Sequence, residues 1–382
     1  IKFTTLYHLI FIVKIKKIMT ICLIGKSLTS LVLSKIIINK GIGVDIYYSN
    51  NKNFNSLSDT NSRTIGLSNY SIDFLESEKI LPKKDCWDIK QINLYKDKNP
   101  ETFLNFKSKS NNFFMVTYNY FYKTLEMKIK KNKLVRFKKY RSQKQLFDLK
   151  KKNYEIIIVT DTSNYLFKKF FSKHYKKNYN STAFTTIISH TKKTNNIAEQ
   201  YFTKFGPLAF LPISNNKTSI VFSVFDKGLI KDKSRIINLI KYYNRIHKIK
   251  EIGKLREFPI YLSLSHNYYH KNILSFGDAL HKVHPLAGQG FNMTLRDAKI
   301  LSELIKNNLD LGLNLNTVLE KFETKRKNTN FLFGIGIDFL HEFFKLFNKY
   351  DLKSVDKFFN IMNKNLFLKK KIENFANKGF FL

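Results

Sequence analysis

The sequence predicts an α/β protein that combines a parallel sheet, an inserted and mostly antiparallel sheet, and a helical C-terminal region. Residues 20–48 run from an apolar strand through a helix to a second apolar strand, which is the pattern of parallel sheets. Residues 181–225 alternate with a period near two and carry β-branched and aromatic side chains, as half-buried strands do. Residues 315–382 are basic, rich in phenylalanine and helical in pattern.

The parallel sheet is predicted from three separate segments. In "TICLIGKSLTSLVLSKIIINKGIGVDIYYSN", a strand ends in a turn at Gly25, a helix covers residues 28–39, and a second strand covers Val44–Tyr48. "NYEIIIVTD" at 153–161 is a buried type of strand that ends on an acid. "KNILSFGDA" at 271–279 returns to a short apolar strand, and we expect its Asp278 to project from the carboxyl edge of the sheet.

The inserted sheet and the following helix also have clear signatures. The strands are "STAFTTIISH" at 181–190, "LAFLPIS" at 208–214 and "TSIVFSVF" at 218–225. After Gly290 the chain becomes helical, and one face of this helix carries Leu295, Ala298, Leu301 and the pair Leu304/Ile305. No internal repeat is present.

Length and composition narrow the class of protein. A chain of 382 residues, 43% hydrophobic, predicts one large composite domain or two closely joined ones. The 67 Lys and Arg outnumber the 29 Asp and Glu, which gives a net charge of +38. Because the lysines are spread over the whole chain and no nucleic-acid-binding motif accompanies them, we expect no nucleic-acid partner.

The cysteines and the first residues bear on localisation. Cys22 and Cys86 are too far apart for a metal motif or a disulfide framework, which favours a reducing, cytoplasmic setting. The apolar run in residues 1–18 is too short to span a bilayer and lacks a small-residue cleavage site. Met19 is the expected start, with residues 1–18 an upstream or disordered extension, and a weak membrane-surface anchor is the alternative.

The segment "GDALHKVHPLAGQGFNMTLRDA" at 277–298 carries the strongest chemical signal. Pro285 restricts the backbone, while Gly288 and Gly290 remove side chains where a ligand must approach the main chain. The helix that follows offers unpaired N–H groups and the positive end of its dipole. Such a site suits a group that gains negative charge, and a reduced flavin fits that description.

The first turn gives a weaker signal. Gly25, Ser27 and Ser30 occupy the three glycine positions of a dinucleotide-binding G-x-G-x-x-G turn. An acid that binds a ribose hydroxyl is expected at the end of the second strand, but Tyr48 or Ser49 stands there. An ordinary strand-to-helix turn remains the alternative.

The central segment closely resembles the GDAAH…HPxAGQGxNxGxxDA signature of flavin-dependent aromatic hydroxylases, the para-hydroxybenzoate-hydroxylase-like monooxygenases. Within them it is most similar to the ubiquinone-biosynthesis hydroxylases, which carry HPxAGQG followed by RD. Three further segments look like motifs of that family: "NSRTIGLS" at 61–68, "EQYFTKFGPLAFLPIS" at 199–214 and "LREFPIYLSLS" at 255–265. The resemblance spans residues 20–378.

The resemblance implies a fold and a division into domains. It implies a Rossmann-like FAD-binding domain formed by residues 19–70, 101–165 and 268–310. The substrate-binding β-sheet domain would comprise 71–100 and 166–267. Residues 311–382 would form C-terminal helices that contact a membrane. The alternative is that these helices pack their phenylalanines inward against the protein.

The resemblance also implies an activity. An FAD-dependent monooxygenase would hydroxylate the aromatic ring of a prenylated phenol in ubiquinone biosynthesis, through a flavin C4a-hydroperoxide, with NAD(P)H and O₂. Most of this chemistry belongs to the cofactor, which explains why the sequence shows no triad or metal cluster. The expected location is cytoplasmic, at the inner face of the membrane, within a quinone-biosynthesis protein complex.

Residue roles follow by similarity. The catalytic residues would be His284 and Pro285, with a structural role for His284 as the alternative. Asp278 would contact the ribityl or pyrophosphate part of FAD, Arg63 would lie on the flavin side, and the backbone from Leu286 to Asn292 would border the isoalloxazine. The expected cofactor-binding residues are Gly25, Ser27, Ser30, Arg63, Asp161, Asp278, Pro285, Ala287, Gly288, Gln289, Gly290, Phe291 and Asn292, and no metal site is expected.

Departures from the family pattern concern the ADP half of the cofactor. The second nucleotide motif, usually G-A-D-G, is here Val159–Thr162, which keeps Asp161 but lacks the glycines. Altered FAD affinity is therefore expected rather than a changed fold. Two other functions remain open: a related flavoprotein acting on another aromatic or isoprenoid substrate, and a non-catalytic member of the quinone-biosynthesis complex.

Overall fold

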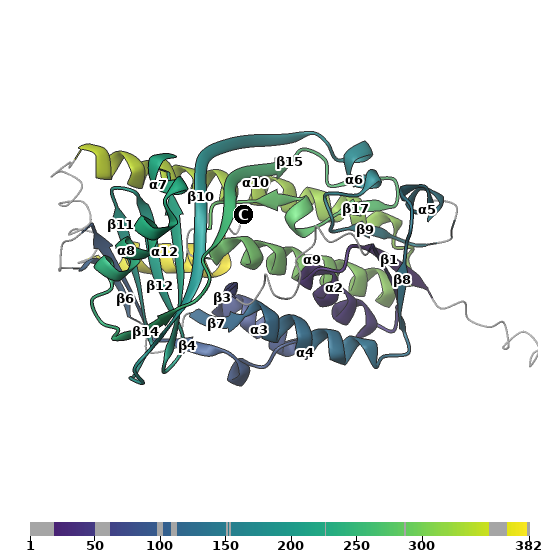
Figure 1. Cartoon of the computed structure of the whole chain (residues 1–382). Coiled ribbons are helices and arrows are strands. Elements are labelled where there is room, and N and C mark those ends of the chain that lie inside the picture. The colour runs from purple at the N-terminus through teal and green to yellow at the C-terminus, as the bar shows by residue number, and fades with distance from the viewer. Residues whose placement is uncertain are drawn as a thin grey trace, which may run out of the picture.

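The computed structural model describes residues 19–49, 62–97, 102–107, 113–149, 152, 154–225, 227–285, 288–350 and 365–379. Within these ranges one sheet has the order β16-β17-β9-β1-β2-β8, and all its neighbours are parallel except the β16–β17 hairpin (Figure 1). The strands are β1 (Thr20–Ile24), β2 (Gly43–Tyr48), β8 (Val135–Lys139), β9 (Ile157–Val159), β16 (Tyr269–His270) and β17 (Ile273–Ser275). The predicted parallel sheet is confirmed.

A larger sheet contains most of the antiparallel pairs. Its order is β18-β15-β10-β13-β12-β11-β5-β6, with β14 paired to β10, and only the β11–β5 pair is parallel among the described strands. The strands are β5 (Gln91–Lys96), β6 (Thr102–Lys107), β10 (His174–His190), β11 (Ile197–Thr203), β12 (Gly206–Ser214), β13 (Lys217–Val224), β14 (Ile249–Ile252), β15 (Arg256–Ser265) and β18 (His281–Lys282). The inserted sheet is therefore also confirmed.

A small third sheet lies between these two. It pairs β3 (Thr64–Ser68) and β4 (Trp87–Ile89) with β7 (Phe113–Thr117). The hydroxyls of Thr64 and Ser219 lie 2.8 Å apart, which joins this sheet to the large one.

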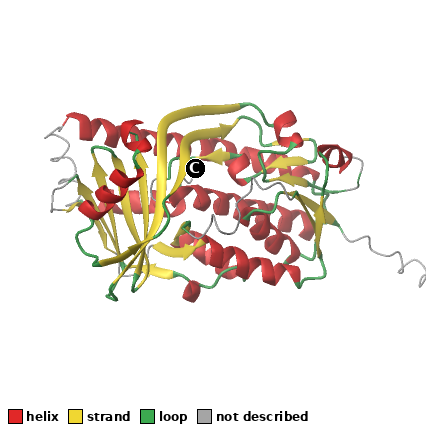
Figure 2. Ribbon diagram, viewed as in Figure 1, coloured by secondary structure: helices red, strands yellow, loops and turns green. Residues whose placement is uncertain are grey.

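Helices fill the space between the sheets and cover their outer faces (Figures 1 and 2). Helix α9 runs between the two large sheets, and α10 and α12 follow it as the predicted C-terminal helices. The helices are α2 (Leu28–Ile38), α3 (Asn69–Ser77), α4 (Tyr118–Lys130), α5 (Gln143–Asp148), α6 (Tyr165–Phe170), α7 (Lys227–Lys231), α8 (Lys233–Tyr243), α9 (Gln289–Asp310), α10 (Asn316–Tyr350) and α12 (Leu366–Lys378), with 3₁₀ turns η2 (Lys83–Asp85) and η4 (Gly277–Ala279).

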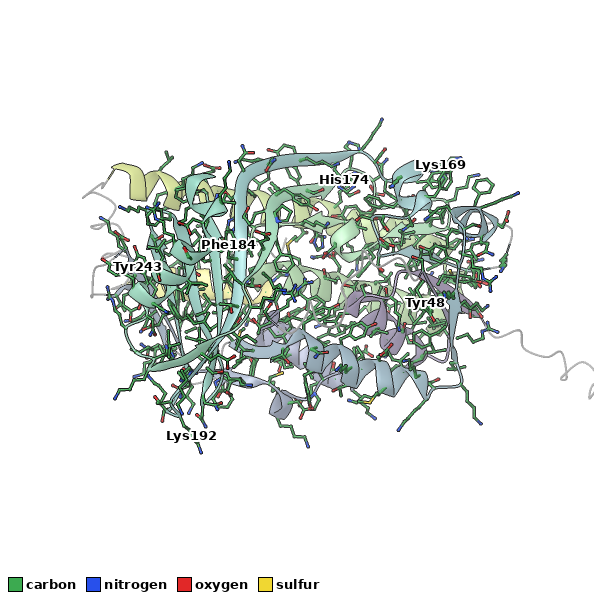
Figure 3. The ribbon with its side chains drawn as sticks, in the orientation of Figure 1. Tyr48, Lys169, His174, Phe184, Lys192 and Tyr243 are labelled. Carbon is green, nitrogen blue, oxygen red and sulfur yellow. The ribbon has the colours of Figure 1, made fainter. Side chains whose placement is uncertain are left out.

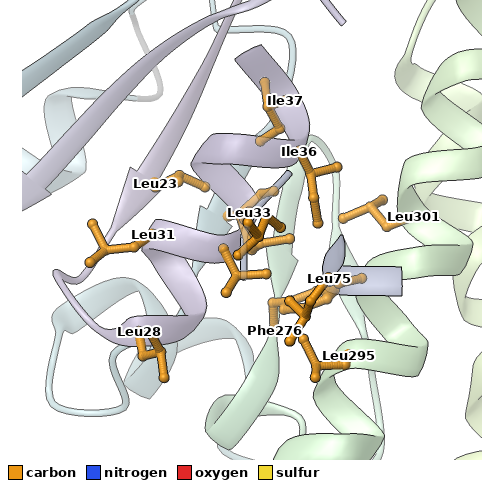
Figure 4. Packing of buried hydrophobic residues seen from close by; sticks show 14 of the residues in the cluster. Leu23, Leu28, Leu31, Leu33, Ile36, Ile37, Leu75, Phe276, Leu295 and Leu301 are labelled. Atoms are coloured by element: carbon orange, nitrogen blue, oxygen red, sulfur yellow. The ribbon is translucent and has the colours of Figure 1, made fainter. Parts of the chain in front are cut away.

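The main core forms where α2, α3 and α9 meet the parallel sheet (Figure 4). The predicted apolar face of α9 is buried there, including Leu295 and Leu301. A second core lies between the large sheet and α8, around Phe184 and Tyr243. Figure 3 shows that these two residues lie at the opposite end of the molecule from Tyr48 of the parallel sheet.

Several element boundaries differ from the sequence expectation. The strand predicted over 153–161 extends only from Ile157 to Val159, and the last parallel strand ends at Ser275. Asp278 therefore belongs to a 3₁₀ turn instead of ending a strand, because Gly277 takes a φ of +66° that breaks the extended backbone. The domain division stays a prediction, and within it β6 pairs with the large sheet although residues 101–165 were assigned to the FAD-binding domain. The predicted extension, residues 1–18, lies outside the described residues.

Candidate functional site

The carboxyl ends of the parallel strands bring part of the predicted site together at one edge. Gly25 follows β1, Asp161 comes shortly after β9, and Asp278 comes shortly after β17. Ligands of open α/β sheets bind at this edge, because the strand-to-helix loops begin there. The residues after β1, β9 and β17 come together although they are far apart in the chain.

The Gly25 turn is tightly packed. Its φ is +115°, and a Cβ at this position would lie 2.6 Å from Oγ1 of Thr160, so only glycine fits. Ser27 caps α2 by accepting the Ser30 N–H at 3.3 Å, and the Ser30 hydroxyl lies 2.7 Å from the Thr160 hydroxyl. Hydroxyl groups thus occupy the positions where the dinucleotide turn normally carries glycines.

The place of the missing strand-end acid is taken by a cation. The amino group of Lys26 lies 5.2 Å from the ring centroid of Tyr48 and 2.6 Å from a carboxylate oxygen of Glu126. Asp161 is buried, and its Oδ1 accepts the Ser163 N–H at 2.8 Å. Part of the Asp161 carboxylate therefore organises its own loop.

Asp278 and Arg63 are both exposed, and the turn that carries Asp278 lies beside the first turn of α2. A Cβ at Gly277 would lie 2.9 Å from Cγ2 of Thr29, which places the η4 turn directly on that helix. The Arg63 guanidinium lies 5.0 Å from the centroid of the Tyr118 ring.

Tyr118 links these groups, and the sequence reasoning missed it. Burial raises the pKa of its hydroxyl, Arg63 and the Leu28 amide lower it, and the charge of Asp278 raises it. Arg63, Asp278 and the N-terminus of α2 therefore act electrostatically on one hydroxyl. The available signal was its position directly after the buried strand "FFMVT", as the first residue of α4.

At the start of α9 the glycine-rich loop leaves space beside its backbone. Gly288 has a φ of +63°, and a Cβ there would approach the Gly66 backbone to 3.6 Å. Among the described residues, a Cβ at Gly290 would meet only Cγ2 of Val283, at 3.8 Å. Leu286 and Ala287, which the sequence analysis also assigned to this loop, lie outside the described residues.

Asn292 holds this loop against the small sheet. Its side chain is fully buried; Oδ1 accepts the Ser68 N–H at 3.0 Å, and Nδ2 donates to the carbonyls of Gly66 at 2.9 Å and Gly288 at 3.1 Å. The neighbouring Phe291 ring packs edge-on against Phe121 at 6.3 Å. The side chains of both residues thus pack against the protein itself.

The predicted catalytic pair lies at the entrance to the same loop. The fully buried His284 ring stacks on His341 with centroids 4.2 Å apart and meets the edge of Tyr179 at 5.5 Å. Burial, followed by the proximity of His341, lowers the pKa of His284 well below its usual value, so the ring is neutral near pH 7. Neither ring nitrogen has a hydrogen-bond partner among the described residues, and Pro285 is half-buried.

A buried ionic network supports α9 behind the loop. Asp297 accepts from His281 at 2.7 Å and from Nε of Arg326 at 2.6 Å, and Asn330 donates to both of its oxygens. Burial would raise the pKa of Asp297, but Arg326 and His281 lower it to about 2. Asp297 is part of the sequence motif but had no predicted role, and in the structure its carboxylate ties α9 to α10.

Two kinds of feature are absent from the described part of the chain. No group of three or more His, Cys, Asp or Glu side chains is placed to hold a metal ion. None of the helices combines the length and the apolar character that a membrane crossing requires.

Comparison with known proteins connects this geometry to a family. The family model described as squalene epoxidase matches residues 241–358. A ubiquinone hydroxylase, UbiL, of Rhodospirillum rubrum is 27% identical over 162 residues, which cover 40% of this chain and 38% of the relative. The ubiquinone biosynthesis monooxygenase COQ6 of Danio rerio is 27% identical over 209 residues, covering 43% of each chain. Each match thus spans less than half the length of these curated relatives.

Solved structures match over nearly the whole chain. The p-nitrophenol 4-monooxygenase PnpA of Pseudomonas putida superposes with a TM-score of 0.75 at 12% identity, covering 94% of this chain and 98% of its own. HpxO of Klebsiella pneumoniae, solved with FAD and uric acid, gives a TM-score of 0.71 at 11% identity, covering 94% and 96%. The chain therefore has the fold of FAD-dependent monooxygenases and is similar in sequence to the ubiquinone-biosynthesis hydroxylases, the family that its motifs indicated.

Proposed function

We propose that this protein is an FAD-dependent monooxygenase that hydroxylates the ring of a prenylated phenol in ubiquinone biosynthesis, with NAD(P)H and O₂ as co-substrates. The observation that carries the proposal is the backbone at the start of α9. There Gly288 turns the chain, Gly290 presents no side chain, and the helix N-terminus offers its dipole. The named relatives support the choice of reaction.

The residues present fit the two halves of FAD differently. On the flavin side, the open backbone at Gly290 suits a flat ring that approaches the helix N-terminus. On the ADP side, Ser27, Ser30 and Thr160 bring hydroxyls into the turn, so backbone amides there are partly engaged. We therefore expect the backbone of this turn to contact the pyrophosphate of FAD differently from a glycine-rich turn.

The chain's own residues would hold the cofactor and shield the reaction. We assign Asp278 to the polar part of FAD, Arg63 to the flavin side and the backbone of residues 288–292 to the ring. FAD, when bound, supplies the redox chemistry and the activation of O₂. Pro285 would form a wall beside the ring, and the neutral His284, stacked on His341, would keep that proline in place.

The choice of an aromatic substrate rests on an apolar face of the large sheet. In "GPLAFLPIS", Leu208 and Phe210 are buried in the core under α8, so the alternate residues Pro207, Ala209 and Leu211 point to the opposite face. These three are half-buried, and Leu211 packs near Met115 of β7. We propose that this face receives the ring and part of the prenyl chain, while it keeps water from the flavin.

Purified protein gives the first test. Under the proposal the protein is yellow, or becomes so with added FAD, and shows an oxidised-flavin absorption band. A colourless protein that takes up no FAD would contradict the proposal and leave the non-catalytic role in the biosynthetic complex.

Substrate identity needs a second experiment. The gene is expressed in strains that each lack one ring hydroxylase, and the quinone intermediates are identified by mass. Restored quinone in one strain identifies the ring position. Failure in every strain, despite flavin-loaded protein, would remove the quinone assignment and favour another aromatic or isoprenoid substrate.

We also propose that the protein docks on the inner, cytoplasmic face of an anionic membrane, from which it takes its substrate. Leu332, Phe339 and Leu346 repeat every seven residues on α10, so they share one helix face, and they are 44%, 66% and 53% exposed. Exposed Lys325 and Lys345 lie on the same helix. Apolar side chains beside lysines are the composition of interfacial helices.

Point substitutions test this docking more cleanly than a truncation after Asp351, which would also remove α12. The double variant Phe339→Ser/Leu346→Ser is expected to lose most co-sedimentation with anionic vesicles. The control Tyr242→Ser removes a side chain that is 52% exposed on α8. Equal sedimentation of the wild type, the double variant and the control would contradict docking through α10.

A further inference from the structure

The last turn of α12 contacts the strand that supports the glycine-rich loop. The Asn377 side chain accepts the Tyr70 N–H through Oδ1 at 2.9 Å, and the Asn377 carbonyl accepts the Ser68 hydroxyl at 3.0 Å. Both partners lie at the start of α3, more than 300 positions earlier in the chain. Asn377 thus supplies two acceptors to the N-terminus of that helix, where backbone N–H groups need partners.

Ser68 is shared between α12 and the loop. Its backbone N–H donates to Oδ1 of Asn292, while its hydroxyl donates to Asn377 and accepts the Ser71 N–H at 3.3 Å. Asn292 in turn binds the carbonyl of Gly288. A continuous hydrogen-bonded chain therefore runs from Asn377 through Ser68 and Asn292 to the Gly288 turn.

Packing keeps the end of α12 in this place. Phe375 lies 4.8 Å from Phe333 of α10, between ring centroids. A Cβ at Gly379, whose φ is +80°, would lie 3.2 Å from Cζ of Arg296, so the helix end lies directly against that guanidinium. Arg296 is buried beneath it and lies 4.4 Å from the Phe333 ring. The contacts to Phe333 and Arg296 leave the final turn of α12 little freedom to shift.

We propose that Asn377 is a positioning residue for the cofactor loop. By accepting the Tyr70 N–H, its side chain holds its own backbone carbonyl on the Ser68 hydroxyl. Through Ser68 and Asn292 this contact sets the place of the Gly288 turn and hence of the backbone that receives the flavin ring. The inference rests on the proposed function. It adds to that function a residue that lies more than 300 positions from its hydrogen-bond partners Ser68 and Tyr70 in the sequence.

Three variants of the full-length protein test the proposal. Asn377→Ala keeps the carbonyl that accepts the Ser68 hydroxyl but removes the acceptor for the Tyr70 N–H that holds this carbonyl in place. It is expected to weaken FAD binding about tenfold, an effect of the size of one lost hydrogen bond. Asn377→Asp keeps the acceptor oxygen and places a negative charge at the start of α3, so it is expected to restore wild-type affinity. Asn374→Ala, an exposed asparagine one turn earlier on α12, is the matched control and should match the wild type.

Two readouts separate positioning from general stability and from the proposed function itself. The first is the FAD dissociation constant with the fine structure of the visible flavin band, which reports the surroundings of the ring. The second is amide hydrogen exchange of residues 62–70 and 288–293 without any cofactor. We expect faster exchange in both segments for Asn377→Ala alone. If this variant does not fold, Asn377→Gln, which only displaces the acceptor, is expected to show the same changes in milder form.

The possible results distinguish a failure of the proposed function from a failure of the positioning role. A wild type that binds no FAD would overturn the proposed function, while the exchange comparison would still test the link between α12 and the loop. Faster exchange confined to α12, or equal behaviour of Asn377→Ala and Asn374→Ala, would overturn the positioning role.

Discussion

Substitution of Gly290 separates the stability of the protein from its ability to bind a flavin. Glycine near the start of a helix costs stability, because the unfolded chain has more freedom to lose. Within the part of the chain that the structure describes, a Cβ at Gly290 would touch only Val283, at the ordinary contact distance of 3.8 Å. We therefore expect Gly290→Ala to stabilise the cofactor-free protein by about 0.5 kcal/mol, a rise of about 1–2 °C in the unfolding midpoint.

The same methyl group would occupy the space through which the ring must approach. Forcing extra carbon atoms into a tight contact costs about 1–3 kcal/mol. This corresponds to a loss of FAD affinity of about 10- to 100-fold. Gly290→Val, with a bulkier side chain, should lose bound FAD altogether while its folded state remains intact.

Differential scanning fluorimetry and FAD titration measure the two effects on the same preparations. Asn307→Val, on the exposed side of α9, is the control for a β-branched residue in this helix. Undiminished FAD occupancy in Gly290→Val would refute the placement of the ring. A fall in the midpoint of cofactor-free Gly290→Ala would refute the claim that the position is open.

Three further predictions concern charges around the site. Asp297 has a pKa of about 2 in the folded state against about 3.9 when unfolded, so its ionised form stabilises the fold above about pH 4 by about 2 to 3 kcal/mol. This stabilisation is lost as the pH falls through 2. Acid denaturation curves of Asp297→Asn should therefore be flatter over that range, and an unchanged curve would contradict the network. Asn292→Asp places a carboxylate against the carbonyl oxygens of Gly66 and Gly288, and this contact favours the protonated form of the new side chain. The unfolding midpoint of this variant should therefore fall as the pH rises above about 4, whereas that of the wild type should not. Arg63→Met should weaken FAD binding about tenfold at low salt and less at high salt, because the guanidinium is exposed; a salt-independent loss would mean that charge is not the cause.

The sequence determined the elements that depend on local patterns. The helix after Gly25 and the apolar face of α9 follow from periodicity, and the structure has them at the expected residues. The motif "HPLAGQG" could be recognised in the sequence because its glycines are required by the conformation of the backbone at their own positions. Element ends were less predictable: a 3₁₀ turn at Asp278 depends on the left-handed backbone of Gly277 against Thr29.

Only the tertiary structure decided which side chains share a site. Tyr118 meets Arg63 and the start of α2 through strand pairing that no local pattern reports. The motif of His284 allowed a catalytic or a structural role, and only the fold shows that contacts from α10 and β10 bury the ring and keep it neutral. Asn377 reaches Ser68 across more than 300 positions. The spacing of residues along the chain shows which backbone positions must lack a side chain. The burial and the charge state of the site's side chains are set by segments that come together only when the chain folds.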